Sequence, residues 1–503
     1  MLTYDYVDEF PWARESVSAY YESPGTIVRL TPEWFASVVQ EPTQGLRVGS
    51  RSELLLRPAW LSMLSGRTLP GSVRPGVRWV AEHIEYEQGR RFVDQMAQGP
   101  LADWRHEHVF AELGDGAKLG EGASGARCRV SDHVEFDLPD PGPRQYTRAG
   151  VTLTSRIFGE LDRVFAYRSA QTRADLEFQA WLRAVTGADA AAAESPKTIA
   201  ISGATGLVGT ALSAFLRALG HRVVALTRNP PEAAVPGVEF VSWNPEKHEL
   251  DPEKLIGVDA VVNLAGASIL GPFTQQHKRA IYQSRRDATW TLVEAMKAVR
   301  KDGGPQALIS ASASGFYGHN AEEVSESGAG GDDFLATVCQ EWEATALRAQ
   351  QFDIRVALVR TGLVLSARGG LLAAQLPLYL AGLGGALGGG KSWMPWISLE
   401  DMIRVYAFAA LNPQVSGPIN AAAPHPVQQR EFAKTLGEVV GRPTRVPTPG
   451  FVPSLVLGKQ GARELALSSA RLIPEALTEQ GFEFRFPHLE SALRHSLGRS
   501  AAN

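Results

Sequence analysis

Three glycines spaced three residues apart stand where an apolar run gives way to a helical pattern, in the stretch IAISGATGLVGT (199–210). The residues before them have the composition of a buried strand, and those after them repeat apolar side chains at helical spacing. In such a junction Gly203 allows a tight turn, Gly206 the close approach of a pyrophosphate, and Gly209 the packing of the helix on the strand. The pattern predicts a doubly wound α/β domain that binds a dinucleotide.

Two later apolar runs support this prediction. HRVVALTR (221–228) reads as a second strand, and DAVVNLAG (259–266) reads as a fourth strand that ends beneath the adenine and ribose. The unpaired amides at the start of the first helix are expected to face the phosphates. The cofactor-binding residues that we predict beside these strands are Gly203, Thr205, Gly206, Leu207, Val208, Gly209, Leu264, Ala265 and Gly266.

The end of the second strand decides which nucleotide is preferred. NAD sites normally place a carboxylate there to hold the ribose 2′-hydroxyl, whereas a guanidinium attracts the 2′-phosphate of NADP. This sequence has Thr227 and Arg228 at that point and no acid. We therefore predict NADP as the cofactor and add Arg228 to the binding residues. The alternative is that Arg228 is a solvated surface charge.

Composition narrows the choice of partners. The 503 residues include 54 acidic and 50 basic ones, which gives a net charge of −4. Such a chain lacks the excess of positive charge that is typical of proteins that bind nucleic acid or an anionic membrane. The uncharged stretch Gly369–Gly390 is interrupted by eight glycines and Pro377, so we expect no membrane insertion. The expected partner is a small-molecule substrate, phosphorylated or apolar. With only Cys128 and Cys339 and no signal-peptide pattern, the chain is expected in the cytoplasm.

Strand periodicity dominates the first part of the chain. In RCRVSDHVEFDL (127–138) every second residue is apolar except Asp132, and an acid that points inward indicates a polar cavity or a paired charge. In DWRHEHVFAEL (103–113) two histidines share a face with two aromatic residues. A helical pattern follows in SRIFGELDRVFAYR (155–168), and we expect this helix to close the domain.

The two histidines are His106 and His108. Alternate strand positions put both imidazoles on one side of the sheet, as a pair of zinc ligands requires. Cavity-lining or hydrogen-bonded core histidines would have the same spacing. Because no third ligand stands at a telling spacing, we predict no metal site.

This front part resembles the START-like (SRPBCC) ligand-binding superfamily, which includes polyketide cyclases and aromatase-like proteins. The resemblance covers about residues 1–180 and lies in the phrases LTPEW, GRRFVDQMAQGPLADWRHEHVF and SDHVEFDLP. It implies an α+β helix-grip domain with a cavity for an apolar or aromatic molecule. The resemblance implies no fixed set of catalytic residues.

The rest of the chain resembles the extended short-chain dehydrogenase/reductase family, and more closely an atypical branch that is labelled epimerase-like or cell-division-inhibitor-like. The phrases GATGLVG, NLAGASI, SASASGFYG, CQEWEATA and RTGLVLSARGG carry this resemblance. The small-residue run GADAAAAESPK reads as a linker. The expected domains are a START-like domain at 1–186, a linker at 187–196, an NADP-binding Rossmann domain at 197–425 and a C-terminal substrate-side lobe at 426–503.

One part of the family pattern is missing. The resemblance implies a catalytic serine, a tyrosine and, four residues after the tyrosine, a lysine that lowers the tyrosine pKa. Ser312 takes the serine position, but DDFLATVCQEWEATAL (332–347) contains neither tyrosine nor lysine. We therefore name Ser312 and Tyr317 as the candidate catalytic residues. Tyr317 is alternatively only a packed aromatic beside the cofactor.

Three functions stay open on this evidence. In the first, Tyr317 or a nearby acid exchanges the proton, and the protein is an NADP-dependent oxidoreductase or nucleoside-diphosphate-sugar epimerase-like enzyme. In the second, NADP is bound without rapid turnover, and the domain senses redox state or scaffolds a partner. In the third, the front cavity carries the main function, binding a hydrophobic ligand or catalysing a cyclase-like reaction.

Two further motifs are weaker. GALGGGKS (385–392) satisfies the triphosphate-loop pattern, but the strand before it and the helix after it are missing, so we expect no ATP site. Arg360 ends the apolar strand IRVALVR and is a candidate for binding an anionic substrate. Arg285 and Arg286 lie in an expected helix, where either could reach a substrate or cofactor phosphate, although a solvated helix face is the default.

Overall fold

The structure is a computed structural model that describes residues 1–57, 76–113, 127–138, 147–148, 151–187, 195–319, 321–444, 447 and 449–499. The chain forms two compact units: the first is Met1–Trp181 with Ala214–Gly220 and Ala233–Gly237, and the second is the remainder. Most of the predicted linker, 187–196, lies outside the described residues. Within the described part, no helix is both long enough and apolar enough to span a bilayer.

The first unit is built on an antiparallel sheet whose strands follow the order β1-β7-β6-β5-β4-β3-β2. These strands are β1 (Leu2–Phe10), β2 (Ala36–Gln40), β3 (Arg51–Leu56), β4 (Val77–Glu87), β5 (Arg91–Gln98), β6 (Asp103–Leu113) and β7 (Arg127–Asp137). The helices are α1 (Arg14–Glu22), α2 (Thr26–Arg29) and α4 (Leu153–Thr186), and a short hairpin joins β8 (Thr147–Arg148) to β9 (Val151–Thr152).

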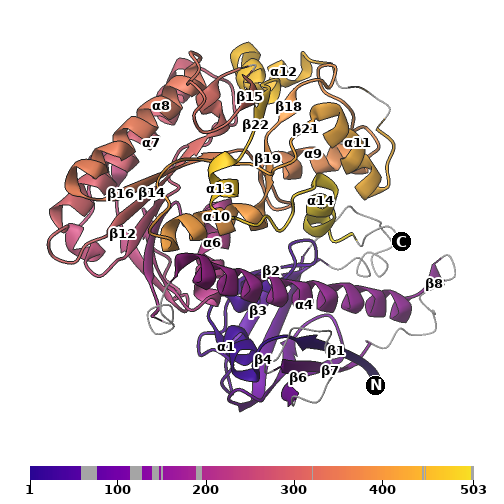
Figure 1. Cartoon of the computed structure of the whole chain (residues 1–503). Coiled ribbons are helices and arrows are strands. Elements are labelled where there is room, and N and C mark those ends of the chain that lie inside the picture. Colours follow the sequence, from indigo (N-terminus) through magenta and orange to yellow (C-terminus); the bar gives the residue numbers. More distant parts are fainter. Residues whose placement is uncertain are drawn as a thin grey trace. The chain divides into compact units, whose positions relative to one another are not determined.

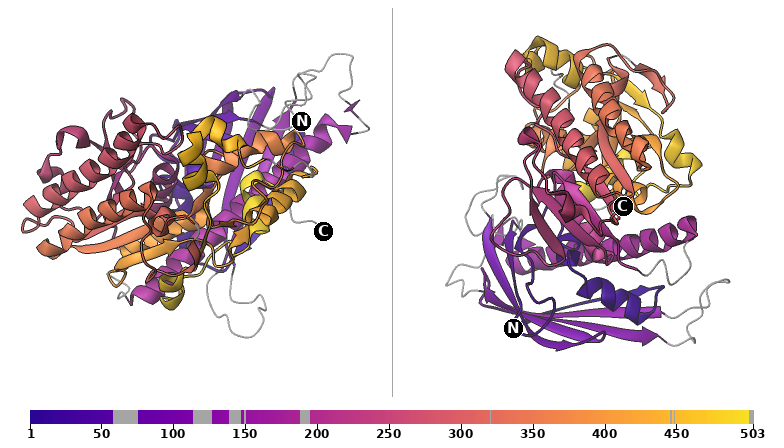
Figure 2. Two further views of the ribbon diagram at one scale, coloured as in Figure 1. Left: turned by 90° about the horizontal axis from the view of Figure 1, so that it is seen from above. Right: turned by 90° about the vertical axis from the view of Figure 1, so that its left-hand side faces the viewer.

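The strand and helix periods predicted for this unit are confirmed. Burial alternates along β6 and β7, with His106, His108 and Asp132 on the buried face. Helix α4 lies along one face of the sheet (Figures 1 and 2), and its apolar residues Ile157 and Phe165 join the core of the sheet. One sheet face is therefore covered by a helix while the other stays polar, as expected for an antiparallel sheet.

The second unit is built on a parallel sheet with the order β12-β11-β10-β13-β14-β16-β20. Its strands are β10 (Thr198–Ser202), β11 (Arg222–Thr227), β12 (Val238–Ser242), β13 (Ala260–Asn263), β14 (Ala307–Ala313), β16 (Arg355–Thr361) and β20 (Gly417–Ala421). The strand order reverses at β10, because its neighbours β11 and β13 both follow it in the chain. The predicted Rossmann-like α/β fold is confirmed, and its ligand crevice is expected at this reversal.

Helices cover both faces of the parallel sheet. They are α6 (Leu207–Ala218), α7 (Gln275–Ala298), α8 (Phe334–Leu347) and α10 (Leu399–Leu411). Helices α7 and α8 lie side by side on one face (Figure 1), where Leu292, Met296 and Ala346 share a core with the strands. Helix α10 packs against β13 and β14 on the opposite face. Near-continuous burial of the strands follows from this double cover.

The C-terminal part of the second unit forms a smaller core around Trp396, Phe432 and Leu493. Its helices are α9 (Gly370–Leu380), α11 (Gln429–Val440), α12 (Val452–Gly461), α13 (Glu475–Glu479) and α14 (Leu489–Leu497). Paired short strands are β15 (Ala321–Val324) with β22 (Ala470–Leu472), β17 (Leu363–Leu365) with β19 (Trp396–Ser398), and β18 (Trp393–Met394) with β21 (Val427–Gln428). Short 3-10 helices are η2 (Pro245–Lys247), η3 (Pro252–Leu255), η4 (Ser314–Tyr317) and η5 (Arg348–Phe352), and η6 (Ala462–Ala466) is a short π-helix.

Candidate functional site

The glycine turn leaves β10 and enters α6 at Leu207. Gly203 has a φ of 68°, and a Cβ there would lie 2.8 Å from the Leu264 carbonyl oxygen. A Cβ at Gly209 would collide with the carbonyl oxygen of Gly203. Gly206 and Thr205, by contrast, are exposed to solvent, although a Cβ at Gly206 would still lie 3.3 Å from the Gly203 carbonyl oxygen. The turn is therefore closed toward the protein and open on the side where a phosphate would approach.

The structure brings the two predicted groups of cofactor-binding residues together. Ser202 Oγ donates to Asn263 Oδ1 at 2.7 Å and accepts from the amides of Leu264, at 3.1 Å, and Ala265, at 3.2 Å. Asn263 Nδ2 donates to Thr289 Oγ1 at 2.8 Å. Sequence reasoning missed Ser202 and Asn263, although polar residues at the ends of two apolar strands were a usable signal. These two side chains hold the loop after β13 against the glycine turn.

The remaining predicted residues of this group are also placed at this edge of the sheet. Leu207 and Val208 are half-buried in the first turn of α6. Gly266 lies against the Arg285 side chain, with an added Cβ 3.3 Å from Arg285 Cζ. Arg285 Nη1 donates to the carbonyl oxygens of Ala267 and Ile281. Arg285 therefore supports the loop after β13, contrary to the solvated position expected for it.

Arg228 follows the last residue of β11 and has a side chain that is 70% exposed. Its Nη1 lies 3.9 Å from Glu246 Oε1, which is itself exposed. An exposed ion pair at this distance contributes little energy, so it would give way to a phosphate. The exposed guanidinium is accessible to a 2′-phosphate. Its exposure is equally expected of a solvated surface charge.

Ser312 lies at the carboxyl end of β14 in a buried charged network. Its Oγ donates to Glu343 Oε1 at 2.6 Å, and Arg360 grips the same carboxylate with Nε and Nη2, each at 2.9 Å. All three side chains are buried. Burial lowers the Arg360 pKa, but the hydrogen bonds and charge of Glu343 together with the contact to Tyr317 raise it above its usual value. The expectation that Arg360 receives an anionic substrate is wrong, because its buried guanidinium is already held by the Glu343 carboxylate within the chain.

Tyr317 belongs to the same network. Its hydroxyl donates to Asn420 Oδ1 at 2.7 Å and accepts from Arg360 Nη1 at 2.9 Å. Burial raises the Tyr317 pKa, and the hydrogen bond from Arg360 works against that rise. The two predicted catalytic residues are thus linked through Glu343 and Arg360. The network lies at the carboxyl ends of β14, β16 and β20, the edge where ligands bind in such sheets.

Helix α8 presents Cys339 and Glu343 to this network, four residues apart. Burial raises the pKa of the Cys339 thiol to about 12, and the Arg285 charge opposes this only in part. A buried neutral thiol and a paired carboxylate therefore stand where the resemblance would place a tyrosine and a lysine. Trp342, between them, lies under Arg285 with its ring centroid 5.1 Å from Cζ.

The glycine-rich segment 385–392 does not form a triphosphate loop. Gly388, Gly389 and Gly390 have positive φ, and the segment leads into the short strand β18 rather than a helix. A phosphate loop needs a helix start to supply its amides. The predicted lack of a helix directly after this segment is therefore confirmed.

A second candidate site is a cavity of about 220 Å³ in the first unit. Its lining is mostly apolar, with polar side chains on one wall that include Asp94, His106 and His108. The prediction that both histidines face one side is confirmed. The expectation that no third ligand accompanies them is wrong, because Asp94 comes from the neighbouring strand β5.

Comparisons with known proteins agree with the parallel-sheet fold. A model of the NAD dependent epimerase/dehydratase family matches residues 199–422, and a domain of unknown function, DUF1731, matches residues 448–496. An epimerase family protein of Mycobacterium bovis is 41% identical over 302 residues, 60% of this chain and 98% of that protein. A chloroplastic SDR39U1 homologue of Arabidopsis thaliana is 37% identical over 60% of this chain and 87% of that protein.

Two solved structures extend these findings. The nucleoside-diphosphate sugar epimerase of Corynebacterium glutamicum has a TM-score of 0.74 and 32% identity, and covers 99% of this chain and 90% of its own. That match therefore includes the antiparallel unit. The human epimerase family protein SDR39U1, solved with NADPH, has a TM-score of 0.54 and 31% identity over 60% of this chain and 99% of its own.

Proposed function

Because the chain belongs to the NAD dependent epimerase/dehydratase family, we propose that its parallel-sheet unit binds NADP and acts on a small-molecule substrate as an oxidoreductase or epimerase. The observation that carries this proposal is the glycine turn, which is packed against the chain at Gly203 and Gly209 and exposed to solvent at Gly206. A bound nicotinamide supplies hydride exchange with the substrate. The residues of the chain would bind the cofactor, orient the substrate and exchange a proton with it.

Binding is assigned to three groups. The backbone amides near Gly206, Leu207 and Val208 would hold the pyrophosphate at the start of α6. The loop from Leu264 to Gly266 would lie beneath the adenine and ribose. Arg228 would receive the 2′-phosphate, since no acid at the end of β11 repels it. The NADPH bound to the human relative supports this choice of cofactor.

Proton exchange is assigned to Tyr317, with Ser312 as a neighbouring hydroxyl. In this chain the cation beside the phenol is Arg360, 2.9 Å from the Tyr317 oxygen, and not a lysine one helical turn away. A cation at that distance favours the phenolate and so works against the effect of burial. The network therefore keeps one feature of proton-transfer sites while lacking the usual pair of residues.

A second function is favoured by the same contacts. Tyr317 and Ser312 already have hydrogen-bond partners within the chain, as expected of a packed structural network. A redox sensor or a scaffold would bind NADP(H) without turnover. Such a protein would not need Tyr317 or Ser312 to contact a substrate. A proton-transferring Tyr317 must also reach the substrate.

Kinetics of one variant separate these two functions. Candidate carbonyl substrates are offered with NADPH, and absorbance reports oxidation of the cofactor. Candidate sugar nucleotides are offered with NADP⁺, and chromatography of the sugar product reports epimerisation, which leaves the cofactor unchanged overall. We expect Tyr317→Phe to lower kcat by about 100-fold or more, the usual share of a general acid, while NADPH affinity changes less than about twofold. Tyr406→Phe, a buried tyrosine of α10, is the matched control. Unchanged turnover in Tyr317→Phe removes Tyr317 from the mechanism, and tight binding without any turnover favours the sensor.

For the first unit we propose the START-like assignment and the boundaries 1–186, 187–196, 197–425 and 426–503. The antiparallel sheet with α4 along one face and a largely apolar cavity support the assignment. That cavity suits a hydrophobic ligand, or a cyclase-like reaction on one. Cys128 and Cys339 are both buried free thiols, which supports a reducing compartment such as the cytoplasm.

A further inference from the structure

The polar wall of the front cavity is assembled by strand register. Asp94 on β5 stands directly opposite His106 on β6, and His108 stands opposite Asp132 on β7. Because side chains two residues apart on a strand share a face, all four point to the same side of the sheet. His106, His108 and Asp132 are each at least nine-tenths buried. Neighbouring strands therefore place two imidazoles and two carboxylates together, with Asp94, His106 and His108 lining an apolar cavity.

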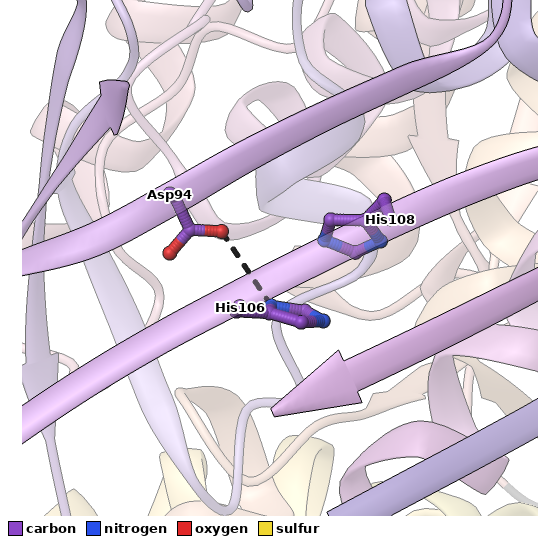
Figure 3. Close-up of side chains that lie close together, drawn as sticks. All are labelled: Asp94, His106 and His108. Atoms are coloured by element: carbon purple, nitrogen blue, oxygen red, sulfur yellow. Dashed lines mark ion pairs between the residues drawn. The ribbon is translucent and has the colours of Figure 1, made fainter. Parts of the chain in front are cut away.

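Three of these side chains have the donor set and spacing of a metal site. His106 Nδ1 lies 3.5 Å from Asp94 Oδ2, and one ligand atom from each of Asp94, His106 and His108 lies within 4.8 Å of the others (Figure 3). In a tetrahedral zinc site, bonds of about 2.0–2.2 Å place the ligand atoms roughly 3.3–3.6 Å apart. The His106–Asp94 pair already has this spacing, and the ligand atoms that are farther apart must move closer together to bind one ion. Two imidazoles and one carboxylate suit zinc and similar divalent transition metals.

Asp132 completes the arrangement as an orienting group. Its Oδ1 is 3.1 Å from His106 Nε2 and 2.6 Å from His108 Nδ1. In metal sites the ring nitrogen that does not bind the ion typically donates to such a carboxylate. The contact leaves His106 Nδ1 facing Asp94, and leaves His108 Nε2 as the other free nitrogen. Despite the short distance, His108 Nδ1 makes no aligned hydrogen bond to any described residue.

Charge also favours a cation. Asp94 lines a largely apolar cavity and Asp132 is buried beside the two histidines, and buried carboxylates are costly unless they are compensated. Besides Asp94, the charged residues that line the cavity are Glu160 and Arg168, which have opposite signs. Two neutral imidazoles with two carboxylates would be balanced by one divalent ion.

We propose that Asp94, His106 and His108 bind a divalent transition metal of the zinc class, oriented by Asp132. Three protein ligands leave one coordination position for water or for a ligand atom. That position faces the cavity, so the ion would hold an oxygen of a small, mostly apolar molecule. This site is independent of the NADP function proposed for the other unit.

Zinc binding to the full-length protein tests the proposal. Protein treated with a chelator is titrated with Zn²⁺ against a chromophoric competitor, and Co²⁺ absorbance reports the ligand field. We expect one saturable site in the wild type, loss of it in His106→Ala and in Asp94→Ala, and a weakening of about 10- to 100-fold in Asp132→Asn. His133→Ala is the control, because His133 lies on β7 with its side chain on the opposite, exposed face.

Two results would overturn the proposal. One is a wild type that shows no saturable Zn²⁺ or Co²⁺ site, and this result does not depend on how any variant folds. The other is zinc binding that His106→Ala and Asp94→Ala leave unchanged while both retain the wild-type circular dichroism spectrum. Either result would assign the four side chains to a hydrogen-bonded network without an ion.

Discussion

The molecule holds two buried polar clusters that are compensated in different ways. In the parallel-sheet unit, Glu343 and Arg360 cancel each other in a bidentate pair. In the front cavity, Asp94 and Asp132 face two histidines, whose charge depends on protonation or on an ion. In the first cluster, the two opposite charges compensate each other within the chain. The second borders an open volume and has a ring nitrogen without an aligned partner.

The difference shows what each cluster can do. A bidentate pair fixes the positions of two elements, here α8 and β16, and it holds Tyr317 and Ser312 in place. A cluster on a cavity wall retains donor atoms that can turn to a ligand or an ion. We therefore expect removal of one partner to affect stability strongly in the first cluster and ligand or metal binding in the second.

The largest expected effect is the loss of the Glu343 carboxylate. Glu343→Gln leaves the buried Arg360 guanidinium without a counter-charge, which typically costs about 3–5 kcal/mol of unfolding free energy. Denaturant unfolding, followed by a probe in the parallel-sheet unit, measures this loss. The double variant Glu343→Met/Arg360→Met is the control, because it removes both charges and should recover most of the stability. If Glu343→Gln lowers the unfolding free energy by less than about 1 kcal/mol, the Arg360 charge does not depend on Glu343 for its compensation.

A smaller effect is expected in the front cluster. Asp132→Asn keeps the size of the side chain and weakens two contacts to histidines, so we expect a cost of about 1–3 kcal/mol. Water in the cavity can replace part of what is lost, which limits the effect. The same unfolding experiment, with a probe in the antiparallel unit, gives the value. A cost equal to that of Glu343→Gln would remove the distinction between the two clusters.

The smallest expected effect is a pH dependence set by Tyr317. Burial raises its pKa in the folded state, so its contribution to stability is fully present below the unfolded value of about 10 and is lost as the pH rises above it. The wild type should therefore lose more stability between pH 8 and pH 11 than Tyr317→Phe does. Unfolding midpoints of both proteins across this range measure the difference. If both proteins lose the same stability over this range, the pKa of the Tyr317 phenol is the same in the folded and unfolded states.

Much of the fold could be predicted because local patterns determine it. The period of two in β6 and β7 and the helical period of α4 were visible in the residues themselves, including the inward position of Asp132. The strand–turn–helix junction at Gly203 was readable because only glycine tolerates its positive φ and its contact with the Leu264 carbonyl.

What could not be predicted depends on contacts between distant elements. Arg360 ends a strand as an anion-binding residue would, but its pairing with Glu343 is fixed by where α8 packs. Asp94 faces His106 only because β5 and β6 pair in one register, and a shift by one residue would turn it to the other face. Register and packing of this kind leave no pattern in a single sequence.

The most direct test of the NADP site compares the two nicotinamide nucleotides. Binding of NADPH and NADH is titrated by fluorescence in the wild type, in Arg228→Ala, and in Arg222→Ala as a control at the opposite, exposed end of β11. A charge-assisted contact to the 2′-phosphate predicts about tenfold tighter binding of NADPH, lost in Arg228→Ala and kept in Arg222→Ala. A wild type that binds neither nucleotide, or that binds NADH more tightly, would contradict the account.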